Sequence, residues 1–417
     1  MADEPLRICL LTYRGNPRSG GQGVYVRLLS NELAALGHHV DVWSGPPYPE
    51  LSPGVGFIRV PSLDLWNEPT LFRWPGLHRL RDPINRSEWA QTLAGRFPEP
   101  LTFSERVARI FNKGKTKSYD IVHDNQCLGP GLLRLRKNIP VVATIHHPIT
   151  IDRRIAYRTT QSMLGRYGLW RWYSFLPIQQ KVSRRLDRIL TVSQASLQDL
   201  QHEYGIPSKL MRVVGNGIDF DVFRPMPEIE RRQDQLITTL SADSPLKGFK
   251  YLLEALTELY KTRPELRLTV IGTPCQRTER KVARLGLQSV VHFTGRVEAE
   301  EITRAYARST IAVVPSLYEG FGFPAGEAMA CEVPVVSTSA GALPEVVGTD
   351  CSCGMLVRPG NAGCLARAIS ELLDAKERRD EMGKAGRRRV LMHFTWRKTT
   401  ERTLAVYREA IAERALN

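Results

Sequence analysis

Two glutamates eight positions apart flank a glycine-rich turn. Glu319 opens the segment EGFGFPAGE and Glu327 closes it, after an apolar run at Thr310–Val314 that predicts a strand. Pro324 stands where the first turn of a helix tolerates proline. A strand, a tight loop and a helix start predict binding of an anion or of sugar hydroxyls, because glycines and unpaired helical amides expose N–H donors. A carboxylate accepts two hydroxyl hydrogen bonds at once, which suits a vicinal diol.

The full stretch Val314–Val336, VPSLYEGFGFPAGEAMACEVPVV, resembles the Glu-x7-Glu signature of the retaining glycosyltransferases of family 4. The resemblance implies that Glu319 contacts the donor sugar and that Glu327 binds the nucleotide ribose. The backbone amides implied to hold the sugar hydroxyls are those of Gly320, Phe321, Gly322 and Phe323. Without the family match, two glutamates around such a turn would indicate a solvated helix start more often than a site.

A dinucleotide-binding fingerprint is the alternative at this place. Gly320, Gly322 and Ala325 satisfy G-x-G-x-x-A after a strand. That fingerprint expects an acidic residue about 20 positions later, at the end of the next strand. The next apolar segment, Val333–Val336, runs into Ser337 with no acid, which disfavours a dehydrogenase.

A second glycine loop follows the first predicted strand, Leu6–Tyr13. Gly20 and Gly21 precede a segment whose apolar residues recur at helical spacing up to Leu36. Most such turns only reverse the chain. In this position the loop resembles the family's N-terminal glycine loop, which implies that the amides of Gly20 and Gly21 lie against the donor diphosphate.

A histidine pair follows the predicted strand Pro140–Ile145. A side chain at the carboxyl end of a parallel strand points to the place where α/β domains bind ligands. The Thr-x-His context resembles the family's, which implies that His146 reaches the donor sugar; His147 is the weaker candidate. The pair could equally form a structural corner.

The remaining donor residues lie in the second half of the chain. SADSPLKGFK resembles the family's phosphate loop, where a lysine and an arginine clamp the diphosphate; Lys247 matches the lysine, whereas Ser241 stands at the arginine position. A charge-assisted hydrogen bond contributes about 1.5–3 kcal/mol, so this departure leaves open how the second phosphate charge is met. HFTGRV resembles the family's strand and loop beside the nucleotide base, which implies that Arg296 lies in the donor site.

Metal sites are disfavoured. Asp219 and Asp221 spell D-x-D, but they belong to an Asn-Gly-x-Asp turn that resembles the family's domain junction, and no further carboxylate cluster follows. Cys351, Cys353 and Cys364 lack a nearby histidine or a second C-x2-C pair. We therefore expect neither a metal nor a cofactor.

Strands alternating with helices in both halves predict two parallel, doubly wound sheets. By resemblance the class is α/β of the GT-B architecture, two Rossmann-like domains facing across a cleft. We place the acceptor-side domain at residues 1–220, a linker at 221–234, the nucleotide-sugar domain at 235–394 and a helix that crosses back at 395–417. The irregular stretch Tyr48–Ser118 fits acceptor-binding elements or a capping subdomain.

The net charge of the chain limits the classes of molecule that it is expected to bind. The 417 residues carry a net charge of +15, which favours a diphosphate donor, an anionic lipid surface or nucleic acid. Residues 151–188 hold nine lysines or arginines, two acids and many aromatic residues, a pattern that fits an anionic membrane or a solvated helix face. No helix-turn-helix or RNA-binding signature appears, so we exclude nucleic acid.

The sequence also bears on location. No apolar run reaches the 18 residues of a membrane span, and the acidic start MADE is unlike a secretory signal. Seven scattered cysteines fit reduced thiols. We expect a cytoplasmic protein. If the basic stretch at residues 151–188 contacts an anionic membrane, the contact is at the inner membrane face; if that stretch is a solvated helix face, no membrane contact is implied.

The resulting prediction is a retaining glycosyltransferase that moves a hexose from a nucleoside-diphosphate sugar to a hydroxyl acceptor, such as a glycolipid or polysaccharide precursor. Glu319, His146 and Lys247 are the expected catalytic residues. By resemblance the reaction is a front-face displacement without a covalent nucleophile, in which Lys247, Gly21 and helix amides stabilise the leaving phosphate. The alternatives are a non-catalytic nucleotide-sugar-binding protein and a transferase with a small soluble acceptor.

Overall fold

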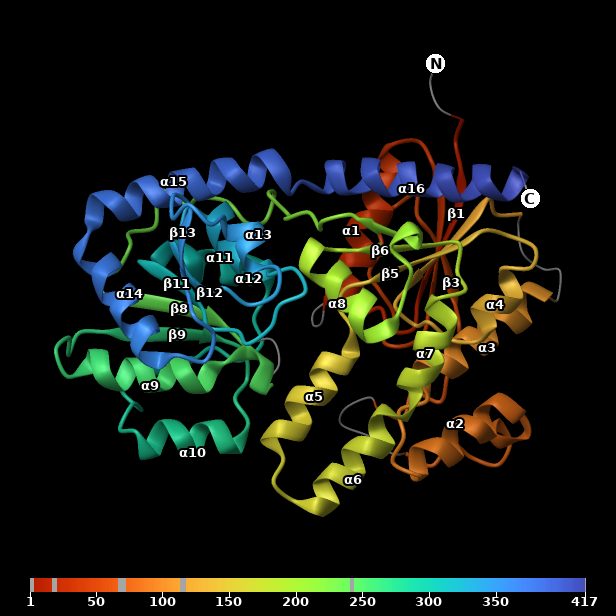
Figure 1. Cartoon of the computed structure of the whole chain (residues 1–417), viewed down its shortest axis with the longest axis horizontal. Coiled ribbons are helices and arrows are strands. Elements are labelled where there is room, and N and C mark those ends of the chain that lie inside the picture. Colours follow the sequence, from red (N-terminus) through yellow and green to blue (C-terminus); the bar gives the residue numbers. More distant parts are fainter. Residues whose placement is uncertain (1–3, 17–20, 67–72, 113–117, 241–243, 417) are drawn as a thin grey trace. The chain divides into compact units, whose positions relative to one another are not determined.

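The computed structural model describes residues 4–16, 21–66, 73–112, 118–240 and 244–416 (Figure 1). Two compact units divide the chain. Unit 1 comprises residues 1–192, 196–214 and 399–417, and unit 2 comprises residues 193–195 and 215–398. Each unit holds one fully parallel sheet, which confirms the predicted α/β class.

Unit 1 is built on a seven-stranded sheet of order β3-β2-β1-β4-β5-β6-β7. Its β4 and β5 are buried at every position, because helices cover both faces of such a sheet. The strands are β1 (Arg7–Thr12), β2 (His39–Ser44), β3 (Gly56–Arg59), β4 (Ile121–Asn125), β5 (Val141–Ile145), β6 (Arg188–Thr191) and β7 (Met211–Val213). The helices are α1 (Gly21–Ala35), η1 (Arg79–Arg81), α2 (Pro83–Leu93), α3 (Glu99–Asn112), α4 (Gly131–Leu135), α5 (Ile149–Thr159), α6 (Met163–Trp172), η2 (Tyr173–Phe175), α7 (Leu176–Ser183), α8 (Gln194–Tyr204) and η3 (Ser208–Leu210).

The stretch predicted to be irregular is partly regular. Between Tyr48 and Ser118 the structure forms β3, α2 and α3. Asp82 caps α2 through its carboxylate, which accepts from the amide of Ile84, and α3 buries Phe103 and Val107 four positions apart. The prolines and tryptophans of this stretch hid the helical period of α3.

The last helix, α16 (Trp396–Leu416), begins in unit 2 and lies mostly in unit 1. Tyr407 is fully buried there, and its hydroxyl lies 2.6 Å from Nδ1 of His123 on β4. Glu409 and Glu413 form ion pairs with Arg188, whose side chain is buried at the start of β6. These contacts fix the helix on the first sheet, along the top of which it runs in Figure 1.

Unit 2 is built on a six-stranded sheet of order β10-β9-β8-β11-β12-β13. The strands are β8 (Gln235–Thr239), β9 (Arg267–Ile271), β10 (Val291–Phe293), β11 (Ile311–Val314), β12 (Val335–Thr338) and β13 (Gly354–Val357). The helices are η4 (Pro245–Lys247), α9 (Phe249–Tyr260), α10 (Gln276–Arg284), α11 (Ala299–Arg308), α12 (Phe323–Ala330), α13 (Leu343–Val347), α14 (Ala362–Asp374) and α15 (Lys376–His393).

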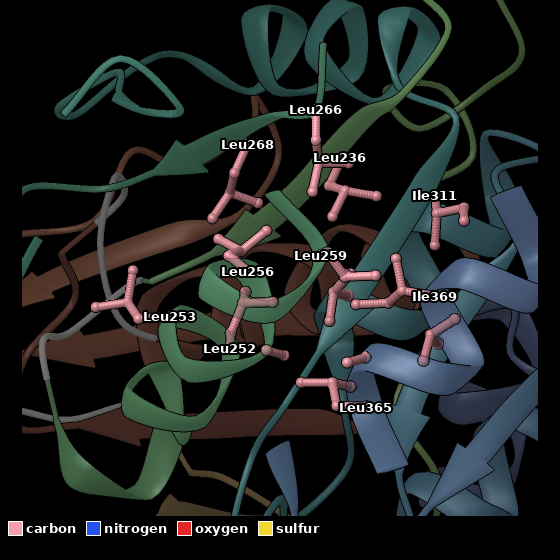
Figure 2. Packing of buried hydrophobic residues seen from close by; sticks show 14 of the residues in the cluster. Leu236, Leu252, Leu253, Leu256, Leu259, Leu266, Leu268, Ile311, Leu365 and Ile369 are labelled. Carbon is pink, nitrogen blue, oxygen red and sulfur yellow. The ribbon is translucent and has the colours of Figure 1, made fainter. Parts of the chain in front are cut away.

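Leucines of α9 form part of the core of unit 2. Leu252, Leu256 and Leu259 repeat at helical spacing, and Figure 2 shows them beside Leu236 of β8 and Ile369 of α14. Truncating one such leucine to alanine typically costs about 2–5 kcal/mol. This core holds rigid the strand ends from which the loops of the candidate site extend.

Candidate functional site

The candidate site of unit 2 forms where β11 ends. Nζ of Lys247 lies 2.8 Å from Oε1 of Glu319, and the Ser316 hydroxyl donates to the same oxygen at 2.7 Å. Glu319 is buried and Lys247 half-buried. The structure therefore joins a cation from the η4 turn and a carboxylate from the loop after β11, two residues that the sequence separates by 72 positions.

Backbone contacts hold these two loops together. The Leu317 amide donates to the carbonyl of Leu246 at 2.6 Å. Gly248, next to Lys247, has a φ of 63°, and a Cβ there would lie 1.9 Å from the carbonyl oxygen of Pro315. Only glycine fits both this conformation and this close approach. The position of the Lys247 ammonium is thus set by the turn as well as by its ion pair.

Glu327 lies close to both charges. Burial raises the pKa of its carboxyl from 4.5 to about 7, against the opposing effects of the Lys247 ammonium and of a hydrogen bond from the Tyr306 hydroxyl, while Glu319 raises the pKa further. The residue keeps some accessible surface although protein surrounds its carboxyl. A carboxyl in this state changes charge near neutral pH.

The turn between the glutamates ends in the predicted helix. Gly322 is the N-cap of α12 with a φ of 107°, and a Cβ there would approach Leu343 to 2.8 Å. Pro324 lies in the first turn of α12. The Phe321 ring is buried against Phe323 and Phe394, so the backbone, rather than this ring, is what the loop can offer to a ligand.

Four other residues were predicted to bind the nucleotide-sugar donor: Arg296, Gly20, Ser241 and Gly21. Arg296 is exposed in the loop after β10, where Gly295 accepts a hydrogen bond from the amide of Gly272. Gly20 and Ser241 lie outside the described residues. Gly21 is the first residue of α1.

The candidate site of unit 1 forms at the carboxyl ends of β4 and β5. Nε2 of His146 lies 2.8 Å from Oδ1 of Asn125, and the Asn125 amide donates to the carbonyl of Gln22 in the first turn of α1. The Tyr25 ring meets the His146 ring edge-on at 4.8 Å. Through these contacts, His146 lies close to the start of α1, which begins at Gly21.

The environment of His146 keeps its imidazole neutral. Burial, with a smaller effect of His147, lowers the pKa of His146 to about 3. Its backbone amide also donates to Oε1 of Gln126 at 2.8 Å. His147 instead pairs with Asp152, Nε2 to Oδ2, at 2.7 Å. His146 is thus an oriented neutral hydrogen-bonding group, whereas His147 fastens the start of α5.

A buried polar chain supports this site. Thr144 on β5 contacts Nε2 of His123 at 2.7 Å and the Tyr25 hydroxyl at 3.0 Å, and His123 in turn contacts Tyr407. Burial lowers the pKa of His123 to about 3. The chain connects α16, β4, β5 and α1, so the helix that closes unit 1 also steadies the ring packed on His146.

The aspartates of the D-x-D pattern form a turn. The Val222 amide lies 3.4 Å from Oδ1 of Asp219, and Asp221 is exposed. In the part of the chain that the structure describes, no group of three or more histidine, cysteine, aspartate or glutamate side chains could hold a metal.

The basic stretch predicted at residues 151–188 is not uniform. Arg154 pairs with Glu203, Arg184 donates to the carbonyl of Tyr204, and buried Arg188 binds α16. By contrast, α6 buries none of its residues and exposes Met163, Leu164, Tyr167 and Trp170 by 53–80%. Within residues 4–16, 21–66, 73–112, 118–240 and 244–416, no helix is long and apolar enough to span a bilayer.

The sequence did not point to several residues that complete these sites. Ser316 and Tyr306 contact the two glutamates, and Asn125 orients His146. Asn125 could have been found, because it is polar and ends the strand β4. Tyr306 could not, since its place on the buried face of α11 matches an ordinary core residue.

Comparisons with known proteins identify the family of the chain. Residues 19–222 match the family model described as Glycosyltransferase Family 4, and residues 226–389 match Glycosyl transferases group 1. The chain is 44% identical to the MMP alpha-(1->4)-mannosyltransferase of Mycolicibacterium hassiacum, over 98% of this chain and 99% of the relative. The chain belongs to glycosyltransferase family 4. This family 4 enzyme is also 26% identical to a D-inositol 3-phosphate glycosyltransferase of Acidothermus cellulolyticus, over 98% and 92% of the two chains.

Solved structures agree on the fold of the glycosyltransferase. Sucrose-phosphate synthase from Thermosynechococcus elongatus superposes with a TM-score of 0.74 at 24% identity, covering 98% of this chain and 100% of that one. HepE from Anabaena, solved with UDP and glucose, gives 0.69 at 17% identity, covering 96% and 99%. The fold is GT-B, as predicted.

Proposed function

We propose that this glycosyltransferase is a retaining enzyme that transfers a hexose from a nucleoside-diphosphate sugar without a metal ion. The observation that carries the proposal is the cluster of Lys247, Glu319 and Glu327 at the loops after β8 and β11. One cation for a diphosphate and two carboxylates for two sets of hydroxyls fit a nucleotide sugar. The solved HepE structure with UDP and glucose supports this ligand class.

Each residue has a distinct part in the proposed reaction. The Lys247 ammonium leaves Glu319 for a phosphate oxygen, and Glu319 then accepts hydroxyls of the transferred sugar. Amides at the start of α12 hold that sugar, and Glu327 holds the ribose. Neutral His146 donates or accepts one hydrogen bond at the sugar.

The leaving diphosphate takes the acceptor proton on the same face of the sugar. The bond from the anomeric carbon to the phosphate oxygen breaks while the bond to the acceptor oxygen forms, so configuration is retained. Lys247 and helix amides stabilise the charge that develops on the phosphate. Glu319 positions the sugar and makes no covalent bond to it.

The proposed donor sugar is mannose and the proposed acceptor is a sugar hydroxyl. Support comes from the 44% identity over nearly the full chain to an alpha-(1->4)-mannosyltransferase. A growing polysaccharide or a glycolipid precursor would offer such a hydroxyl. A small soluble sugar is the alternative acceptor.

The deciding experiment pairs calorimetry with product detection. Nucleoside diphosphates of all common bases and their mannose and glucose conjugates are titrated, and each bound conjugate is incubated with methyl mannosides and mannose oligosaccharides. Transfer with retained anomeric configuration supports the proposal. Binding of nucleotide sugars without transfer to any hydroxyl acceptor would contradict it and indicate a binding protein.

We further propose a cytoplasmic enzyme that contacts anionic membrane through the outward face of α6. Met163, Leu164, Tyr167 and Trp170 lie on one side of this helix at successive spacings of one, three and three residues. Arg158, near the end of α5, and Arg166 of α6 are exposed, and the Arg171 guanidinium lies 5.6 Å from the Tyr167 ring centroid. Apolar and aromatic side chains flanked by arginines suit the lipid headgroup boundary.

A further inference from the structure

Four aromatic rings gather at the carboxyl end of β1. The Trp172 ring stacks on Phe97 at 4.9 Å and 20°, and Trp66 meets Trp172 edge-on at 5.0 Å. Tyr13, the first residue after β1, contacts Phe97 at 6.4 Å. The rings come from four separate segments of unit 1, so the fold assembles the cluster.

A charged pair lies against these rings. Nε and Nη2 of Arg14 bind Oε2 and Oε1 of Glu99 at 2.6 and 3.0 Å, and the guanidinium lies 5.5 Å from the Phe97 ring centroid. Glu99 is buried, whereas about a third of the Arg14 side chain is exposed. A guanidinium has five N–H donors and a carboxylate about four acceptor positions. The two hydrogen bonds between Arg14 and Glu99 therefore leave further donor and acceptor positions on both groups for a ligand.

The cluster adjoins the candidate site of unit 1. The Gln22 side chain hydrogen-bonds the Tyr13 hydroxyl, and the Gln22 carbonyl accepts from Asn125, which orients His146. In register, β1 pairs with β4, and β4 pairs with β5. Three hydrogen-bonded steps therefore separate the aromatic cluster from the histidine proposed to contact the transferred sugar.

Partial exposure distinguishes these rings from an ordinary core. Phe175, which also contacts Phe97, is 4% exposed, but Tyr13, Trp66, Phe97 and Trp172 each keep accessible surface. Aromatic side chains with one apolar and one wet side are enriched at binding surfaces. Ring faces next to a few fixed polar groups are the usual lining of a small-molecule site.

We infer that this cluster, called here the β1 aromatic subsite and defined by Tyr13, Arg14, Trp66, Phe97, Glu99 and Trp172, binds the acceptor. Its ligand is the hexopyranose ring that carries the attacked hydroxyl. The C–H face of the sugar packs on Trp66 and Trp172, while Arg14 donates to and Glu99 accepts from its hydroxyls. The inference rests on the proposed sugar acceptor and adds the residues that select it.

The test uses Trp66→Leu and Arg14→Lys in the full chain. Leucine removes the ring face, and lysine keeps the charge but loses the bidentate fork. We expect the KM for a mannoside acceptor to rise about tenfold in each variant, while the KM for the nucleotide sugar changes less than twofold. Trp74→Leu, a matched change at an exposed tryptophan whose ring contacts Trp89, should leave both values unchanged.

A second measurement separates the subsite from the reaction. Saturation-transfer NMR with the mannoside and no donor should show ring contacts in the wild type and in Trp74→Leu, and weaker ones in Trp66→Leu. Wild-type KM and NMR signals in both test variants would overturn the subsite even with transfer intact. If the wild type transfers no sugar, the proposed function fails, and the NMR comparison still decides whether the β1 aromatic subsite binds a sugar.

Discussion

Nζ of Lys247 and Oε1 of Glu319 lie 2.8 Å apart, so the cation and the carboxylate proposed for the donor neutralise each other. Both side chains are mostly buried, with 22% and 11% of their surface exposed. Binding of a diphosphate sugar must replace this pair with two new ones, Lys247 to phosphate and Glu319 to sugar hydroxyls. The pair therefore prepares the site for a ligand that carries both groups.

Substitutions at Glu319 and at Lys247 should impair different steps of the reaction. Glu319→Gln should lower kcat by about 100-fold with little change in nucleoside-diphosphate affinity, because it weakens hydrogen bonds to the sugar alone. Lys247→Met should weaken nucleoside-diphosphate binding by about 10- to 100-fold, since a charge-assisted contact contributes about 1.5–3 kcal/mol. Steady-state kinetics and calorimetry separate the effects.

Lys250→Met is the matched control, because Lys250 is exposed on the neighbouring helix α9 and lies 4.0 Å from Glu254. It should behave as the wild type. Equal losses of affinity in Lys247→Met and Lys250→Met would mean that general surface charge, and not the paired site, attracts the nucleotide.

Glu327 should make donor binding pH-dependent. Its pKa of about 7 means that the carboxylate needed to accept ribose hydroxyls forms only as the pH rises through neutrality. Affinity for a nucleotide sugar, whose phosphates do not titrate in this range, should rise several-fold between pH 5.5 and 8.5. Calorimetry should give a flat profile for Glu327→Gln and weaker nucleotide binding for Glu327→Ala.

The same raised pKa affects stability. Between pH 4.5 and 7 the folded chain holds a proton on Glu327 that the unfolded chain has released. The stability gained from this proton is therefore fully present below pH 4.5 and is lost as the pH rises through 7. Above pH 7, Glu327→Gln should therefore be more stable than the wild type by on the order of 3 kcal/mol and should unfold at a higher temperature. Indistinguishable melting curves at pH 8.5 would show that the carboxyl is not destabilised by burial.

The sequence predicted the two sheets and the loop around Glu319 because their signals are local: buried strands read as apolar runs, and Gly322 and Pro324 mark a helix start. The pairing of Lys247 with Glu319 depends on the neighbouring positions of β8 and β11, which no short motif encodes. The helix α3 was missed because the prolines and tryptophans of the stretch from Tyr48 to Ser118 hid its helical period. The sequence alone treats Arg154, Arg184 and Arg188 as surface charge, whereas in the structure each of them binds a partner within the protein.

His146 should contribute without titrating. Because burial lowers its pKa to about 3, the ring stays neutral from pH 5 upward. His146→Ala should reduce kcat by on the order of 100-fold, with donor affinity nearly unchanged, and should leave the shape of the kcat profile between pH 5.5 and 8.5 as in the wild type. An inflection near pH 6.5 that disappears in His146→Ala would show instead that the imidazole exchanges a proton during turnover.

Turnover should survive EDTA. The phosphate charge is met in the proposal by Lys247 and by helix amides, and Asp219 serves a turn. Initial rates with and without chelator should agree within twofold, and added Mg²⁺ or Mn²⁺ should not raise them. Loss of activity in EDTA that Mn²⁺ restores, and that Asp219→Ala reproduces, would identify a metal ligand.

The outward face of α6 should bind anionic vesicles. Leu164 and Trp170 are 80% and 60% exposed, and each nearby arginine contributes about 1 kcal/mol at an anionic surface. The wild type should co-sediment with vesicles containing phosphatidylglycerol and remain in the supernatant with neutral vesicles. The double variant Leu164→Glu and Trp170→Glu should lose this binding, whereas Leu93→Glu, a change at a leucine of α2 that is 64% exposed, should keep it. Co-sedimentation of all three proteins to the same extent would exclude α6 as the contact, and recovery of the wild type in the supernatant with both lipids would favour a soluble acceptor.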